Sequence, residues 1–178
     1  NAASLVEEVI MQARVPLDAA DLEREARVVE RGNIFDDFEV GQIFEHHWGR
    51  TLTQAENALF STLTLHFNPH YFNVEYAKAH GHSDTLLNPL LIFNTVFGLS
   101  VEDLSEAGMG PFLGVSELTY HLAVLSGETL TARSTVIAKR DTRKRPDFGI
   151  VTWHTQGFQS DGAQVIDFKR SNLIRRSR

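Results

Sequence analysis

The sequence contains no cysteine, and this absence excludes several kinds of chemistry. Disulfide bonds, thiolate metal sites and cysteine nucleophiles cannot occur in these 178 residues. An excess of positive charge is missing too, because 23 acidic residues outnumber 17 basic ones and the formal net charge is -6. The C-terminus is locally basic, but no basic face is evident, so we expect no nucleic-acid partner.

Long apolar runs are also lacking. The most apolar stretch, residues 86–101, contains asparagine, proline, threonine and glycine and is too short and too polar to span a membrane. The N-terminal residues do not show the basic-then-apolar order of a secretory signal. We therefore expect a cytoplasmic protein without a membrane partner, and its length predicts a single main domain.

Residues 1–31 are predicted to form an N-terminal helical extension, outside a main domain at residues 32–178. Ser4 and Asp18 are suitable N-caps for two helices, and Pro16 would end the first of them. Both helices are expected to be peripheral to the main domain.

The main domain is expected to begin with one strand, followed by several helices. The strand is predicted over residues 43–52, and the segment from Thr53 to Glu56 has the spacing of a capping box that starts a helix through residue 65. A short helix is expected over 74–79 and a long one over 89–104, with a proline in its first turn. Because the long helix is apolar on every face, we expect other elements to cover most of its sides.

Four β-rich segments follow the long helix. They span residues 112–124, 129–140, 149–159 and 164–175 and are rich in valine, isoleucine, threonine and aromatic residues. The pair Asp161-Gly162 is a strong signal for a hairpin turn. We expect these strands to form an antiparallel meander that curls around the long helix, which is an α+β fold.

The segment from His66 to Ala77 resembles the signature of MaoC-like hydratases. It has the sequence HFNPHYFNVEYA, and the family's segment has the form Asp-x-Asn-Pro-x-His followed by an acidic or amide residue and an aromatic-alanine pair. The likeness extends from residue 31 to residue 176 and includes Leu87-Asn88-Pro89 before the long helix. It is closest to the branch that acts on mesaconyl-, itaconyl- and methylmalyl-type coenzyme A esters.

The resemblance implies a hot-dog fold, in which an antiparallel sheet wraps around a long central helix, and a hydro-lyase activity. The implied reaction adds or removes water at the double bond of a short, branched or dicarboxylic 2-enoyl-CoA thioester. Coenzyme A would enter as part of the substrate, and neither a separate cofactor nor a metal is expected. The uncovered sheet edge predicts a homodimer, a double hot-dog or a higher homo-oligomer.

Two positions of the family motif carry other residues in this chain. The resemblance places His66 where the family has its catalytic aspartate and Tyr71 where it has its catalytic histidine. An imidazole can act as a general base near neutral pH, so His66 is expected to hold and deprotonate water. A phenol is a poor base but can donate a hydrogen bond, so Tyr71 is expected to orient the water or relay the proton. The same replacements are also compatible with a site that has lost its chemistry.

A third difference lies at the start of the long helix. The family binds the thioester oxygen with the backbone amide of a glycine, and that glycine corresponds to Pro89, which has no amide hydrogen. The amide of Leu90 or of Leu91 is the expected substitute, since a helix N-terminus favours negative charge. Asn88 would either contact the substrate with its side chain or cap the helix.

Four further residues are candidates for substrate contact. Asn68 is expected mainly to shape the turn before Pro69, and His82 to line the acyl pocket. Arg143 and Arg145 belong to a basic turn that would either be solvated or bind the phosphates of coenzyme A. The histidines do not have the spacing of a zinc site, so we expect no metal.

Two rival functions remain open from the sequence. A hot-dog thioesterase needs a base or a nucleophile beside the same helix terminus and would release free coenzyme A. An acyl-CoA-binding subunit without catalytic activity is favoured by the missing aspartate, histidine and glycine. Replacing His66 by alanine distinguishes an enzyme, which should lose most of its turnover, from a binding module.

Overall fold

The computed structural model of the protein describes residues 32–108 and 110–176. These residues belong to one compact unit that runs from Arg31 to the end of the chain. The helices expected within residues 1–31 lie outside the described residues. Within the described ranges, no helix is long and apolar enough to cross a membrane.

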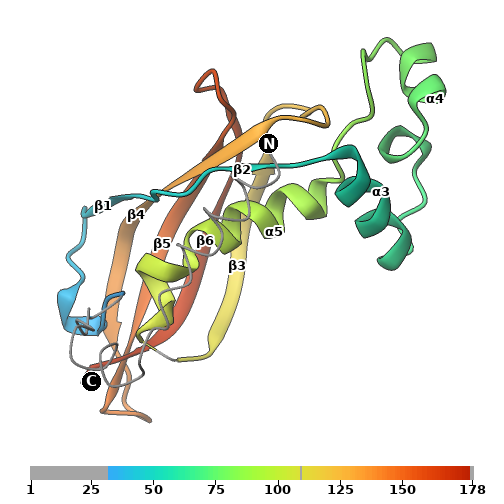
Figure 1. Cartoon of the computed structure of the whole chain (residues 1–178). Coiled ribbons are helices and arrows are strands. Elements are labelled where there is room, and N and C mark those ends of the chain that lie inside the picture. The colour runs from blue at the N-terminus through green and yellow to red at the C-terminus, as the bar shows by residue number, and fades with distance from the viewer. Residues whose placement is uncertain (1–31, 109, 177–178) are drawn as a thin grey trace, which may run out of the picture. The chain divides into compact units, whose positions relative to one another are not determined.

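Short helices and two short strands come first in the chain, and four long strands come last (Figure 1). The first group is η1 (Phe35–Asp37), β1 (Ile43–Glu45), β2 (Arg50–Thr51), α3 (Gln54–Leu63), η2 (Pro69–Tyr71) and α4 (Val74–Ala79). Two helical segments follow, α5 (Pro89–Leu99) and the π-helical η3 (Glu102–Glu106). The last group is β3 (Phe112–Tyr120), β4 (Thr129–Asp141), β5 (Phe148–Phe158) and β6 (Gln164–Arg175).

Capping side chains start the two short helices next to the site. Thr53 and Glu56 form the expected capping box of α3, with the Thr53 hydroxyl accepting from the amide of Glu56. Asn73 caps α4 by accepting from the amide of Tyr76, and α4 occupies the residues expected for it. The strand expected over 43–52 is present as two pieces, β1 and β2, which both pair with β4.

The sheet is antiparallel, with the strand order β1-β4-β5-β6-β3 and with β2 also paired to β4. Strands β4, β5 and β6 form the expected meander, but the expectation is wrong for β3, which pairs with β6. The chain between β3 and β4 instead crosses past the start of α5. On the way Val124 accepts a hydrogen bond from the amide of Leu87, and Gly127 donates one to Leu52. This crossing brings residues 121–128 close to the candidate site.

Helix α5 packs one face on the sheet and leaves another face exposed (Figure 1). Ile92 and Val96 are buried in a core cluster that also contains residues of β4 and β6. Leu90 is 45% exposed, and Asn94 and Gly98 are exposed as well. These exposed residues form a single stripe, so the other sides of the helix are covered as expected.

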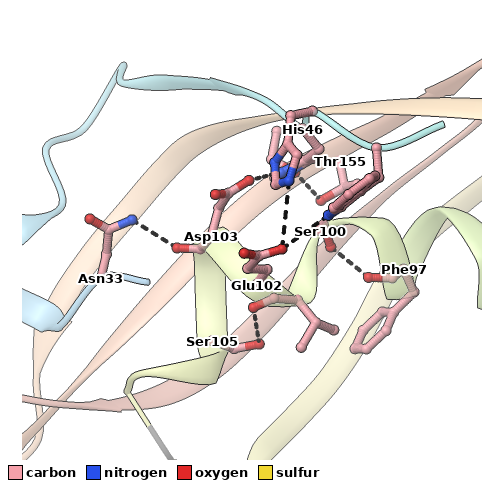
Figure 2. Close-up of polar contacts among 12 residues, drawn as sticks. Asn33, His46, Phe97, Ser100, Glu102, Asp103, Ser105 and Thr155 are labelled. Atoms are coloured by element: carbon pink, nitrogen blue, oxygen red, sulfur yellow. Dashed lines mark hydrogen bonds and ion pairs between the residues drawn. The ribbon is translucent and has the colours of Figure 1, made fainter. Parts of the chain in front are cut away.

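A buried polar network holds η3 against the sheet (Figure 2). Nδ1 of His46 lies 2.6 Å from a carboxylate oxygen of Asp103, and its Nε2 lies 2.9 Å from the hydroxyl of Ser134. Ser134 in turn contacts Thr155 at 2.9 Å. The side chains of His46 and Ser134 are buried and their hydrogen bonds link η3 to β4, so we assign this Asp-His-Ser arrangement to structure.

Arg170 on β6 completes the attachment of the segment after α5. Its guanidinium donates to the hydroxyls of Ser100 at 2.8 Å and Ser105 at 2.7 Å, and it lies over the ring of Phe97. Arg170 is fully buried, and this burial lowers its pKa to about 10. The helix expected over 89–104 is thus present as α5 followed by η3. The hydrogen bonds of Arg170 to Ser100 and Ser105 join this part of the chain to β6.

Candidate active site

Asn57 joins the three segments that form the site. This residue lies on α3 and is fully buried. Its Nδ2 donates to the carbonyl oxygens of Tyr71 and Leu86, both at 2.7 Å, and its Oδ1 accepts from the amide of Asn88 at 2.7 Å. One side chain therefore fixes η2, the loop before α5 and the start of α5. This role could not be predicted from the sequence, because a single asparagine inside a helix forms no motif.

Asn88 is the N-cap of α5, and that role occupies its side chain. Its Oδ1 accepts from the amide of Leu90 at 3.0 Å, and its Nδ2 donates to the hydroxyl of Ser61 at 3.1 Å. Of the two roles expected for Asn88, the structure therefore contains the helix cap.

The first amides of α5 all have acceptors. Leu90 donates to Oδ1 of Asn88, while Leu91 and Ile92 donate to the carbonyl oxygen of Asn88. Pro89 has no amide hydrogen. The expectation that the Leu90 or Leu91 amide binds a thioester oxygen therefore finds no free donor here, because the cap uses both amides.

His66 and Tyr71, the two expected catalytic residues, are in contact. Their ring centroids are 5.1 Å apart and the ring planes are inclined by 75°. Nδ1 of His66 is buried and has no hydrogen-bond partner among the described residues. Burial raises the pKa of Tyr71, although a hydrogen bond with the side chain of Asn68 opposes this effect. The Tyr71 hydroxyl thus stays protonated at neutral pH and can donate a hydrogen bond.

A cavity of about 310 Å³ lies at the start of α5. Tyr71 lines it, whereas His66 is not among the lining residues. Tyr120 lines it too, and its hydroxyl donates to the carbonyl oxygen of Pro89 at 2.8 Å. The other lining residues are mostly apolar: Leu86, Leu87, Pro89, Ile92, His121, Leu122, Ala123 and Val124. A cavity of this size and character suits a small acyl group.

Asn68 and His82 lie in the same part of the chain as the cavity but do not line it. Asn68 caps η2 by accepting from the amide of His70 at 3.1 Å, which is the turn-shaping role expected for it. The ring of His82 lies 5.8 Å from that of His70, between ring centroids. The expected contact of His82 with the acyl group is not supported by this position.

Arg143 and Arg145 lie in the turn between β4 and β5. This turn is at the end of the sheet remote from α3 and α4 (Figure 1). Both side chains are exposed, and the guanidinium of Arg145 lies 4.4 Å from the centre of the Phe148 ring. The structure does not bring the two arginines to the cavity, and their contact with coenzyme A phosphates stays a prediction.

The sequence did not predict a polar cluster in which Asp167 binds two histidines. Asp167 accepts from Nε2 of His121 at 2.5 Å and from Nε2 of His154 at 2.7 Å. Burial would raise the pKa of Asp167, but the hydrogen bonds from the two histidines outweigh it and lower the pKa. Throughout residues 32–108 and 110–176, no group of three or more histidine, aspartate or glutamate side chains is arranged to hold a metal ion.

Comparison with solved structures identifies the fold. The crystal structure of a MaoC domain protein dehydratase from Chloroflexus aurantiacus matches with a TM-score of 0.78 and 27% sequence identity. The match covers 86% of this chain and 43% of that one. The domain therefore has the hot-dog fold of MaoC-like dehydratases, as the sequence predicted.

Comparison of sequences narrows this class to one family. Residues 17–178 match the mesaconyl-CoA hydratase family. The mesaconyl-CoA hydratase of Haloarcula marismortui is 34% identical over 148 residues, which are 83% of this chain and 41% of that protein. The beta-methylmalyl-CoA dehydratase of Chloroflexus aurantiacus is 30% identical over 145 residues, 82% of this chain and 41% of that protein. The chain belongs to the mesaconyl-CoA hydratase family, and it spans about 41% of the length of these two relatives.

Proposed function

We propose that the domain hydrates or dehydrates a 2-enoyl-CoA thioester that has a short, branched or dicarboxylic acyl group. The observation that carries the proposal is the contact between His66 and Tyr71, because Tyr71 lines the cavity at the start of α5. The resemblance to the MaoC-like motif assigns these residues to its two catalytic positions, and the chain belongs to the mesaconyl-CoA hydratase family. Coenzyme A enters as part of the substrate. That the domain needs no metal and no other cofactor stays a prediction, and so does its cytoplasmic location.

The reaction requires a base for the water and a proton for the α-carbon. In our proposal His66 accepts a proton from the water while the water oxygen bonds to the β-carbon of the enoyl group. The imidazolium then returns a proton to the α-carbon, so one water is consumed and the imidazole is regenerated. Tyr71 contributes a protonated hydroxyl as a hydrogen-bond donor.

The experiment is an assay of the full chain against straight, branched and carboxylated 2-enoyl-CoA esters. Loss of the ultraviolet absorbance of the conjugated thioester reports reaction, and mass spectrometry identifies the product. We expect a hydroxyacyl-CoA, heavier than the substrate by one water. Free coenzyme A would instead identify a thioesterase, and a panel of esters that all remain unchanged would contradict the proposal.

A second candidate is an acyl-CoA-binding domain whose reacting groups are supplied by another domain or subunit. The engaged amides of Leu90 and Leu91 favour it, as does the replacement of the motif's aspartate and histidine by His66 and Tyr71. Such a domain would bind an acyl-CoA ester saturably without converting it. In complex with its catalytic partner, its turnover would be insensitive to His66→Ala.

We also propose that β3 pairs with a second hot-dog sheet, in a homodimer or within a longer protein. Among the described strands, β3 has a neighbour on one side only. Phe112 and Leu113 on this strand are both 50% exposed, and exposed apolar side chains on an edge strand are unfavourable in water. Sedimentation of the full chain over a range of concentrations tests the homodimer. A homodimer should be weakened by Leu113→Lys, and a monomer at every concentration would contradict it.

A further inference from the structure

At the start of α5, the proposed reaction finds no free backbone donor for the thioester oxygen. As water attacks the double bond, negative charge moves onto this oxygen, and the site has to stabilise it. Pro89 has no amide hydrogen, and the amides of Leu90, Leu91 and Ile92 are bonded to Asn88. While the cap of α5 is intact, the donor has to come from another group that lines the cavity.

Two tyrosine hydroxyls are placed for this role. Tyr71 and Tyr120 both line the cavity, together with Pro89. The Tyr120 hydroxyl lies 2.8 Å from the carbonyl oxygen of Pro89, which places it at the first residue of α5. Burial, and then the proximity of Tyr71, raise the pKa of Tyr120. Burial also raises the pKa of Tyr71, so both groups are protonated donors at neutral pH.

Asn68 leaves the proton of Tyr71 free for a ligand. The Oδ1 atom of Asn68 accepts from the amide of His70 at 3.1 Å and lies 3.0 Å from Nδ1 of the same histidine. The side chain of Asn68 lowers the pKa of Tyr71, which is the effect of a hydrogen-bond donor, and Nδ2 is the group of Asn68 that remains for a hydrogen bond to the Tyr71 oxygen. An amide nitrogen only donates, so the Tyr71 oxygen is the acceptor in that bond. The hydroxyl proton of Tyr71 is therefore available to an oxygen in the cavity.

We propose that the hydroxyls of Tyr71 and Tyr120 together bind the thioester oxygen of the substrate and stabilise its enolate. Asn68 acts as a positioning residue, because it orients the Tyr71 hydroxyl. The assignment rests on the proposed hydration of an enoyl-CoA ester and adds Tyr120 to the groups that touch the reacting atoms. When the ester binds, Tyr120 turns its proton from the neutral carbonyl of Pro89 to the developing oxyanion, which is the stronger acceptor.

The test uses a 3-ketoacyl-CoA, an ester whose enolate absorbs differently from its neutral form. The fraction of bound ester in the enolate form then reports stabilisation of the thioester oxygen without any turnover. On the full chain we expect an enolate band that saturates with ligand. Tyr71→Phe and Tyr120→Phe should each lower the enolate equilibrium constant on the order of 100-fold, the size of effect seen when one oxyanion donor is removed.

Tyr76 provides a matched control. It is the third of the 3 tyrosines in the chain; it does not line the cavity, and its ring stacks on that of His80 at 4.1 Å. Tyr76→Phe should keep the full enolate band. The role of Asn68 is tested by a double-mutant cycle, in which Asn68→Ala should lower the enolate fraction in the Tyr120→Phe protein and leave it unchanged in the Tyr71→Phe protein.

The outcomes separate this assignment from the proposed function. A protein that binds the ester without forming an enolate overturns the assignment, and so does a Tyr71→Phe, Tyr120→Phe double variant that keeps the full enolate band. If the enolate forms and is lost in the variants while no enoyl-CoA is hydrated, the two-tyrosine site stands and the hydratase proposal fails. If hydration proceeds equally well in the double variant, the hydratase proposal stands and the two-tyrosine site fails.

Discussion

The Oδ1 atom of Asn57 accepts a hydrogen bond of 2.7 Å from the backbone amide of Asn88. Since Asn57 lies on α3 and Asn88 caps α5, this bond joins the helix before the site to the helix after it. The same side chain holds the carbonyl oxygen of Tyr71 at 2.7 Å. The relative position of Tyr71 and the start of α5 therefore depends on the buried side-chain amide of Asn57, which lies on α3 and belongs to neither segment.

Asn57→Ala should destabilise the domain strongly. The change removes the Asn57 partner of two partly buried carbonyl oxygens and of one buried amide. Each unpaired buried group costs on the order of 1–3 kcal/mol, so the expected loss is about 3 kcal/mol. Urea unfolding measures it. Gln54→Ala, at an exposed position of the same helix, is the control and should change the free energy of unfolding by less than about 1 kcal/mol. Equal losses in the two variants would refute the role given to Asn57.

His46 should make the stability of the domain depend on pH. Burial lowers the pKa of His46 below its ordinary 6.5, in spite of opposing contributions from Asp103 and Glu45, and Arg170 also lowers it. The unfolded chain thus takes up a proton more readily than the folded one, so stability is present above about pH 6.5 and falls as the pH decreases below it. His46→Gln should flatten this decrease in urea unfolding between pH 8 and pH 5.

The control for His46 is its neighbour His47, whose side chain is 55% exposed. His47→Gln should leave the pH dependence close to that of the unchanged protein. If the two variants have the same dependence on pH, the burial of His46 is not its cause.

Glu56 should stabilise the start of α3 only while it is ionised. The hydrogen bond from the amide of Thr53, with the contribution of Arg50, lowers the pKa of Glu56 from 4.5 to about 2. The stabilisation is therefore complete above about pH 4.5 and is lost as the pH falls toward 2. Because the carboxylate is solvent-accessible, Glu56→Gln should cost only about 1 kcal/mol at pH 7.

The difference in stability between the Glu56→Gln variant and the unchanged protein should shrink as the pH falls toward 2, because the native glutamate is increasingly protonated there. Glu75→Gln on α4, with a side chain that is 85% exposed, controls for the removal of one negative charge. A loss of stability that is equal at pH 2 and pH 7 would contradict the capping explanation.

The parts of the fold that the sequence predicted depend on neighbours close in the chain. The Thr53–Glu56 capping box, the short helix α4 and the meander of β4, β5 and β6 all follow from short spacings and turn signals. The pairing of β3 with β6 does not, since it joins segments separated by two other strands. Local pattern cannot choose between such long-range partners.

The candidate site shows the same difference between features that local sequence predicts and features that depend on long-range contacts. The motif brought attention to His66 and Tyr71, and the structure places their rings in contact. Whether the Leu90 amide is free depends on where the Asn88 side chain points, which no spacing reveals. Tyr120 was missed for a related reason, because only the crossing of the chain after β3 brings it to the start of α5.

The central claim is that His66 is the base that activates water in the hydration of an enoyl-CoA ester. The most direct measurement is the kcat of His66→Ala compared with that of the unchanged protein, on the best ester of the panel. We predict a fall in kcat on the order of 100- to 10,000-fold, the contribution typical of a general base, with a smaller change in KM. A variant that retains its kcat would contradict the account and would place the chemistry outside this site.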